Sequence, residues 1–215
     1  MSDFSDFKTQ LKDWCNRQDW SDALVTSYVR AAEQKCNQEL RIAWMIQSDD
    51  ATIADRCGPL PPDWLEMILV RIAASNSADG WFPIHYRPQD EFFRTLAVSE
   101  TSASAATWAY YTIVGRQIFF GGPPNTVDGT AYRIAYYGEV PVFSDDQDSW
   151  LYDKYPSLYL YAALMHADLH AIGEEQSAAN MKTLAEDLIQ KLNAEHMRSK
   201  ASGSRLTRSR VRSFG

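Results

Sequence analysis

Residues 110–120 read YYTIVGRQIFF, and this stretch decides the fold class of the central part of the chain. Two runs of β-branched and aromatic residues, 110–114 and 117–120, flank the pair Gly115-Arg116. A two-residue connection that begins with glycine is typical of a type II′ hairpin turn, because glycine reaches a positive φ without steric cost. The stretch therefore predicts two antiparallel strands.

The neighbouring segments extend this prediction to a sheet. Gly121-Gly122-Pro123-Pro124 ends the second strand, since neither residue type supports a central strand, and Tyr132–Tyr137 predicts a third. Upstream, Thr52–Cys57 is a short strand candidate. The almost continuously apolar Trp64–Ile72 fits either a buried strand or a helical turn followed by a strand. Two further expectations are a helical segment over Pro88–Leu96 and a loop over the Ser/Ala-rich residues 99–106.

Both ends of the chain have helical periodicity. Near the N-terminus, one apolar face is predicted from Phe4, Phe7, Leu11 and Trp14, and Ser21 is a suitable N-cap for a second helix that runs to about Ile46. Near the C-terminus, an apolar stripe from Leu158 to Ile172 follows Pro156-Ser157 and stops at Gly173. A last helix spans Ala178 to Leu192.

These elements predict an α+β fold. We expect a helical bundle built from residues 1–49 and 150–197, an antiparallel β-rich lobe inserted over residues 50–149, and a basic extended C-terminal tail over residues 198–215. Apolar periodicity stops after about Met197, so we expect the tail to be disordered in isolation.

The tail differs sharply in charge from the rest of the chain. The whole chain has a net charge of −7, yet residues 198–215 carry six basic side chains and no acid. Residues 1–197 therefore hold 15 basic and 28 acidic side chains, a net charge of −13. An acidic body repels nucleic acid at short range, whereas the tail attracts polyanions or acidic protein surfaces.

Two functional interpretations of the tail stay open. One is contact with nucleic acid through neutralised phosphates. The other is docking onto a partner protein, because apolar side chains are interleaved with the basic ones and alternating arginines would share one side of an extended segment. The candidate partner-binding residues are Arg198, Lys200, Arg205, Leu206, Arg208, Arg210, Val211, Arg212 and Phe214.

Other candidate sites have weaker support. His166 and His170 stand four residues apart, which is a metal-ligand spacing, but Ala167 leaves out the glutamate of zinc proteases. The run Asp145-Asp146-Gln147-Asp148 lacks the EF-hand pattern and fits a solvated loop that caps the next element. Cys36 lies on an apolar stripe and is expected in the core. We expect no catalytic residues, no metal and no cofactor.

The composition restricts the class of protein. The charged opening residues do not resemble a signal peptide, and no apolar run is long enough for a membrane helix. Cys15, Cys36 and Cys57 are odd in number and widely spaced, which fits a reduced cytosolic compartment. Seven Trp and eleven Tyr favour a protein with interfaces.

The order of motifs resembles tailed-bacteriophage head-to-tail adaptor proteins, the relatives of the tubular tail protein of short-tailed phages and of head-completion connectors. Apart from residues 99–106 and Trp108, which fit the pattern less well, the resemblance covers nearly the whole chain. The segments that carry it are LPPDWLE (60–66), PIHY (83–86), 111–120 with the turn and the Pro-Pro pair, AYYGEVPVFS (135–144), WL (150–151) and YPSLYLYAAL (155–164).

The resemblance implies a structural protein of the virion neck that is made in the host cytoplasm and is not an enzyme. It implies a ring of about twelve copies bound to the portal protein, with the β-rich lobe against the next tail or neck protein and the C-terminal tail reaching into the portal. Genomic DNA would pass through without specific binding, and no membrane is involved. The alternative function is a phage accessory protein that binds nucleic acid through the basic tail.

Overall fold

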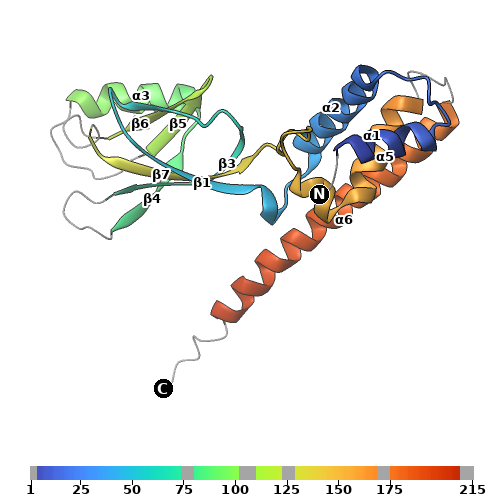
Figure 1. Cartoon of the computed structure of the whole chain (residues 1–215). Helices are drawn as coiled ribbons and strands as arrows, with labels where there is room; N and C mark the ends of the chain where they lie inside the picture. Colours follow the sequence, from blue (N-terminus) through green and yellow to red (C-terminus); the bar gives the residue numbers. More distant parts are fainter. Residues whose placement is uncertain (1–3, 74–79, 102–109, 123–128, 169–174, 209–215) are drawn as a thin grey trace. The chain divides into compact units, whose positions relative to one another are not determined.

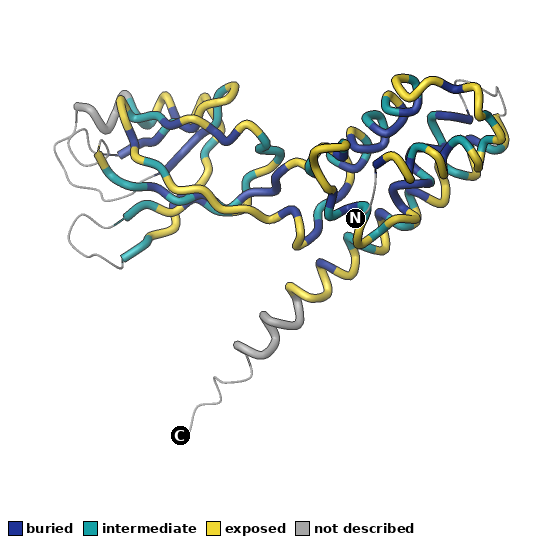
Figure 2. The backbone as a smooth tube through the Cα atoms, in the orientation of Figure 1, coloured by how far each residue is buried: buried dark blue, intermediate teal, exposed yellow. Residues whose placement is uncertain are grey.

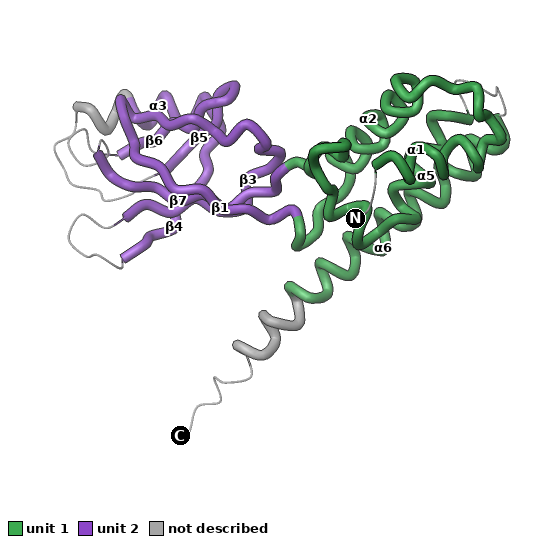
Figure 3. The backbone as a smooth tube through the Cα atoms, in the orientation of Figure 1, with its two compact units in different colours: residues 1–44, 139–215 green, residues 45–138 purple. Residues whose placement is uncertain are grey.

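The computed structural model divides the chain into two compact units, residues 1–44 with 139–215 and residues 45–138 (Figure 1 and Figure 3). We call the first the helical unit and the second the sheet unit. The structure describes residues 4–73, 80–101, 110–122, 129–168 and 175–208, of which 97–101 and 201–208 are described by their backbone alone. The predicted α+β class is confirmed.

The helical unit packs its helices around an aromatic core. The first helix has the predicted buried face of Phe4, Phe7 and Leu11, whereas Trp14 is 58% exposed and does not belong to it. The Phe7 ring meets that of Tyr159 edge-on at 5.3 Å, and Phe143 stacks on Tyr152 at 4.9 Å. The helices are α1 (Phe4–Trp14), α2 (Asp22–Glu39), α4 (Trp150–Lys154), α5 (Pro156–Ala167) and α6 (Glu175–Arg208).

Helix α2 begins as predicted and ends earlier than predicted. The Ser21 side chain accepts a hydrogen bond from Leu24 N at 3.3 Å, which is the expected N-cap. The helix stops at Glu39, not near Ile46, because Asn193 of α6 takes over its last backbone groups. Asn193 Nδ2 donates to Glu39 O at 2.9 Å, and Arg41 N donates to Asn193 Oδ1 at 2.7 Å. A tertiary contact therefore sets this boundary.

The sheet unit is a seven-stranded sheet with the order β1-β7-β3-β4-β5-β6-β2. All neighbouring strands are antiparallel except β4 and β5. A short 3-10 helix, η1 (Ala43–Met45), precedes the first strand. The strands are β1 (Ile46–Thr52), β2 (Cys57–Pro59), β3 (Trp64–Ala73), β4 (Trp81–Tyr86), β5 (Tyr110–Val114), β6 (Gln117–Gly121) and β7 (Ala131–Gly138).

The two edge strands of the sheet are consecutive in the sequence, so the sheet curls round on itself. Only residues 53–56 separate β1 from β2. Ala54 and Cys57 exchange backbone hydrogen bonds of 3.1 and 2.9 Å, and Asp55 and Arg56 adopt positive φ angles of 48° and 58°. The prediction of one strand over Thr52–Cys57 was wrong, because a tight turn breaks this segment.

The predicted hairpin is confirmed. Strands β5 and β6 pair from Tyr110↔Gly121 to Val114↔Gln117, and Gly115 has a φ of +62°. The ambiguous apolar run is a strand, β3, with two register irregularities against β7. The helix predicted over Pro88–Leu96 is α3 (Gln89–Thr101), so the predicted loop is wrong for 99–101, and 102–106 lie outside the described residues.

The interior of the sheet unit is formed by inward-facing residues of the strands, with α3 packed beside them (Figure 2). Phe92 of α3 is buried and meets Tyr110 edge-on at 5.3 Å. Val70, Ile118, Phe120, Tyr132 and Ile134 are each at most 1% exposed. These large side chains form one contiguous core.

The C-terminal region corrects one prediction. The prediction of an extended tail from residue 198 is wrong for residues 198–208, because they continue helix α6. Residues 209–215 lie outside the described residues. Helix propagation adds one hydrogen bond for each residue fixed, so a helix already formed continues through Arg, Lys and Ala with little penalty. The predicted end of α5 at Ile172 falls in residues 169–174, also outside the described part; the described helix ends at Ala167.

Candidate functional site

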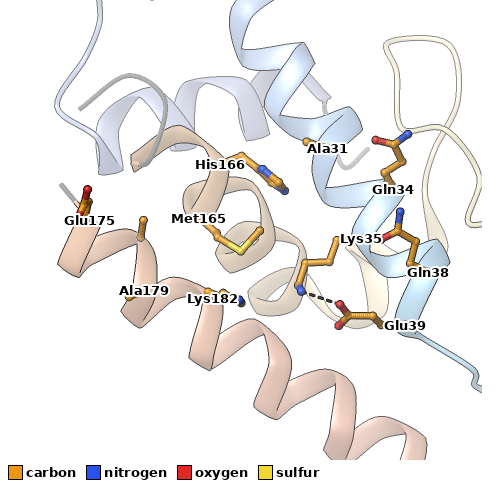
Figure 4. A pocket seen from close by; sticks show the side chains of 11 residues that line it. Ala31, Gln34, Lys35, Gln38, Glu39, Met165, His166, Glu175, Ala179 and Lys182 are labelled. Atoms are coloured by element: carbon orange, nitrogen blue, oxygen red, sulfur yellow. Dashed lines mark hydrogen bonds and ion pairs between the residues drawn. The ribbon is translucent and has the colours of Figure 1, made fainter. Parts of the chain in front are cut away.

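A groove in the helical unit is a concave site formed by described residues of three helices. Its walls are α2 and α6, and the end of α5 is its floor, as Figure 4 shows. The volume is about 580 Å³. Met165 of α5 and the small residues Ala31, Ala178 and Ala179 supply its apolar lining. The size is that of a site for a small ligand or for one large side chain of a partner protein.

An ion-pair cluster lies along one side of this groove. Lys35 Nζ lies 2.9 Å from Glu39 Oε1 and 3.2 Å from Glu186 Oε1, and Lys182 Nζ lies 3.8 Å from the same Glu186 oxygen. Burial acts to lower the pKa of Lys35, but its hydrogen bonds to the two carboxylates prevail and raise it. The Lys35 side chain is only 11% exposed, so it holds a fixed positive charge in the groove.

His166 brings an unsatisfied polar atom to the same groove. Its Nε2 is buried and has no hydrogen-bond partner among the described residues. Burial and, to a smaller extent, the charge of Lys35 lower the pKa of His166, so the imidazole is neutral at neutral pH. A neutral imidazole nitrogen accepts or donates one hydrogen bond. Because buried polar groups are normally paired, this unpaired nitrogen is an unfavourable feature of the packed helices.

The predicted histidine pair gives no support for a metal site. His170 lies outside the described residues, and within the described part no three metal-ligating side chains come together. The thiols of Cys15 and Cys36 offer little nucleophilic character. Burial raises the pKa of Cys15 to about 11 and that of Cys36 to about 12, so both stay protonated at neutral pH. Cys36 is fully buried, as predicted.

Five of the nine predicted partner-binding residues lie at the end of α6. Arg198 and Lys200 are exposed, and the C-terminal part of α6 extends past the other helices of the unit (Figure 1). For Arg205, Leu206 and Arg208 the structure gives a helical backbone; Arg210, Val211, Arg212 and Phe214 lie outside the described residues. Neither Arg198 nor Lys200 lines the groove. Cations at a helix C-terminus also interact favourably with the helix dipole.

A buried carboxylate holds the segment after β7 against the helices. Glu33 of α2 is 5% exposed and accepts hydrogen bonds from Arg30 Nη1, Phe143 N and Tyr159 Oη at 2.6–2.9 Å. Arg30 Nη1 also donates to Phe143 O at 3.0 Å. This cluster was not predicted from the sequence. Its available signal was Glu33 itself, a charged residue on the helix face that also carries the apolar Val29, Ala32 and Cys36.

The outer face of the sheet carries a short row of charged and aromatic side chains. Arg133 of β7 makes two hydrogen bonds of 2.6 Å to the carboxylate of Asp50 on β1, and its guanidinium lies 4.5 Å from the Trp81 ring centroid. Arg71 of β3 pairs with Arg133 in the strand register. Because Asp50 already neutralises Arg133, we interpret these side chains as a solvated ion pair and not as an anion-binding site.

All four residues of the acidic loop 145–148 are exposed, and backbone hydrogen bonds between Ser144 and Gln147 close the loop. Lys8 Nζ lies 3.7 Å from Asp145. The N-cap position of α4 is occupied by Ser149 rather than by an aspartate.

Among the described residues, the helices are all too short or too polar to cross a membrane.

Comparison with known families gives a match over nearly the whole chain. A family model described as SU10 adaptor protein matches residues 2–212. The match includes the groove, the buried carboxylate, the sheet unit and most of the basic end of the chain. No curated protein matches the chain.

Proposed function

Because the chain belongs to the SU10 adaptor protein family, a phage head–tail adaptor family, we propose that it is the subunit of a ring that joins the portal protein to the tail or neck. The single observation that supports this most strongly is the match over residues 2–212, since it includes both units and the basic end. The ring would lie in the virion neck after assembly in the host cytoplasm, and about twelve copies would form it.

We propose a division of roles among the parts of the chain. The helical unit would pack side by side with its copies, the sheet unit would meet the next tail or neck protein, and the basic end from residue 198 would dock onto the portal. The charge supports the last role, because six basic side chains gather in residues 198–215 of an otherwise acidic protein. Arg198 and Lys200 are exposed on a helical segment and need no unfolding to reach a partner.

The same charge distribution fits a channel through which DNA passes. Residues 1–197 have a net charge of −13. A negatively charged wall repels phosphates within the screening length of about 8–10 Å at cellular salt, so DNA would not adhere to it. This part of the proposal requires that acidic side chains outnumber Lys and Arg on the surface that lines the channel of the assembled ring.

Co-sedimentation with the portal protein of the same phage tests the docking role. Three forms are compared: the full chain, a 1–208 truncation and a 1–197 truncation. We expect the full chain to saturate the portal at about one copy per portal subunit and the 1–197 form to stay unbound. The 1–208 form shows whether the helical part of the basic end suffices. Binding of the 1–197 form as tight as that of the full chain would reject docking through the basic end.

The second candidate function, a nucleic-acid-binding accessory protein, is favoured only by the basic end. It predicts DNA binding by the isolated chain that weakens steeply with salt and disappears in the 1–197 truncation. The adaptor function predicts weak DNA retention at physiological salt together with portal binding. If no form binds the portal and the full chain retains DNA, the accessory function replaces the adaptor function.

A further inference from the structure

One edge of the sheet unit is open to a further strand. Strand β1 is seven residues long, stands at one end of the strand order, and is exposed at every position except Ala51. The strand at the other end, β2, has only three residues and finishes at Pro59, which has no N–H to donate. A long edge strand accepts an extended segment through its backbone, so β1 is the edge at which strand addition is possible.

The backbone of β1 presents hydrogen-bonding groups to this edge. Ile53 N donates to Thr130 O at 3.0 Å, so the residues in step with Ile53 point to β7. The alternate residues Ser48 and Asp50 point away from β7, because the two strands pair without a register shift. Asp50 N donates at 3.0 Å to the exposed carboxylate of the adjacent Asp49 and not to another strand. An added strand can therefore pair with these groups.

The charge of β1 restricts which segment can be added. Asp50 is neutralised by Arg133, whereas Asp49 is exposed and forms no ion pair with a described residue. An acidic edge repels segments of like charge, including β1 of another copy. Residues 1–197 have a net charge of −13, whereas residues 198–215 carry six basic side chains and no acid. Within this chain, the basic end is therefore the segment whose charge complements the edge.

The last part of the basic end has a sequence that suits an added strand. Residues 209–214 read SRVRSF, contain neither glycine nor proline, and follow Arg208, the last residue of α6. In an extended segment, Arg210 and Arg212 share one side and Val211 lies on the other. Strand addition combines main-chain hydrogen bonds with alternating side-chain contacts, so this pattern offers both backbone pairing and a row of positive charge.

We infer that residues 209–214 of one copy add as a strand to the free edge of β1 in a neighbouring copy. The side that carries Arg210 and Arg212 lies over Asp49, and the backbone pairs with the outward groups of β1. The inference rests on the proposed function, which brings the copies together in a ring. It leaves the helical part of the basic end, residues 198–208, for the portal.

Photo-cross-linking in the portal-bound protein tests this contact. Val211 is replaced by p-benzoylphenylalanine, and unlabelled and isotope-labelled chains are mixed in equal amounts before they bind the portal. We expect cross-links from position 211 to residues 46–52, with pairs that join a labelled to an unlabelled peptide. The same amino acid at Ser202, in the helical part of the basic end, is the matched control and should give at least about tenfold less of this product.

Two results of this measurement overturn the inference. One is a cross-link from position 211 to the portal or to another part of the chain in place of residues 46–52. The other is a set of pairs in which both peptides always carry the same label, because the tail would then contact its own chain.

A charge exchange tests the ion pairs separately. Asp49→Arg should lower the yield of the position 211 cross-link about fivefold or more, because attraction to two arginines becomes repulsion. Adding Arg210→Glu and Arg212→Glu to this variant should restore the yield, since the charges are then opposite again. Asp90→Arg reverses an exposed acid on α3 of the same unit and should leave the yield unchanged.

The tail variant Arg210→Glu, Arg212→Glu measures the same contact without a change in either folded unit. It should lower the yield as Asp49→Arg does, because the tail then carries the same sign of charge as the edge. Thermal unfolding checks that the variants of the sheet unit are folded.

The outcomes separate this inference from the proposed function. If the wild-type chain binds the portal and position 211 does not cross-link to residues 46–52, the contact is rejected and the adaptor role stands. If the wild-type chain does not bind the portal, the proposed function fails. A charge exchange that does not restore the yield also rejects the contact, as does an equal loss in Asp90→Arg, because recognition would then not depend on Asp49.

Discussion

Tyr159 Oη donates a hydrogen bond of 2.6 Å to Glu33 Oε1 inside the helical unit. Phe143 N donates to the same oxygen at 2.7 Å, so one carboxylate joins α2, α5 and the segment that follows β7. Burial, together with the negative charge of Glu33, raises the pKa of Tyr159 far above its usual range. The phenol therefore remains a donor throughout the pH range in which the protein is handled.

Replacing this donor should destabilise the fold. We expect Tyr159→Phe to lower the free energy of unfolding by about 1.5–3 kcal/mol, the range for a hydrogen bond to a charged group, because Glu33 stays buried with one donor fewer. Urea denaturation measures the change. Tyr161→Phe on the same helix is the matched control, since Tyr161 is only half-buried, and it should change the value by less than about 0.5 kcal/mol. Equal effects of both substitutions would contradict the role of the Glu33 contact.

The neutral His166 predicts a pH dependence of stability. Its pKa is lowered in the fold by burial and by Lys35, so the unfolded chain takes up a proton first as the pH falls below about 6.5. The stabilising contribution of the neutral imidazole is therefore present above that pH and is lost as the pH falls through the lowered pKa. The charged side chains that line the groove with His166 are Lys35, Glu39, Glu175 and Lys182.

We expect His166→Gln to reduce the loss of stability between pH 7.5 and pH 5, because glutamine does not titrate. The measurement is the urea midpoint at both pH values for the wild type and the variant. Gln34→Ala, which changes a neutral residue of the same groove, should leave the wild-type difference intact. A variant that loses as much stability as the wild type would show that other groups cause the acid sensitivity.

The parts of the fold that local chemistry determines were predictable from the sequence. Gly115 marks the hairpin because its backbone conformation has φ > 0, and Ser21 marks the start of α2 because its hydroxyl caps the helix. The end of α2 was not predictable, since Asn193, more than 150 residues away, takes over its terminal backbone groups. Strand β1 was missed because it is an edge strand with an exposed, polar sequence, so it has little of the alternation that indicates a half-buried strand.

The candidate site was less predictable than the fold. The groove arises from three helices, and residues such as Ala31 and Ala179 carry no signal until the helices are packed. His166 was noticed for its spacing to His170, whereas its structural interest is the buried, unpaired Nε2. The basic end was identified from charge alone, but charge does not determine conformation, and residues 198–208 continue α6.

The hairpin turn allows a test of backbone strain. Gly115 has a φ of +62°, and no atom lies within 4 Å of the position that a Cβ would take. A substitution there therefore costs backbone energy without a steric clash. We expect Gly115→Ala to lower the free energy of unfolding by about 1–2 kcal/mol. Gln117→Ala, at an exposed position of the adjoining strand, should have a clearly smaller effect in the same urea titration. No loss in Gly115→Ala would mean that the turn changes its type at little cost.

The charge of the basic end predicts a salt-dependent effect on portal binding. Arg198 and Lys200 are exposed on α6, and both would face an acidic surface of the portal under the proposed function. We expect the double variant Arg198→Ala, Lys200→Ala to bind about 2–30-fold more weakly at 0.1 M salt, since each exposed ion pair contributes about 0.2–1 kcal/mol. At 1 M salt, where the Debye length falls to about 3 Å, the difference from the wild type should vanish. Lys191→Ala, an exposed lysine earlier on the same helix, is the matched control and should bind as the wild type does at both salt concentrations. If Lys191→Ala weakens binding as much as the double variant, the portal responds to the overall charge of the chain and not to its basic end.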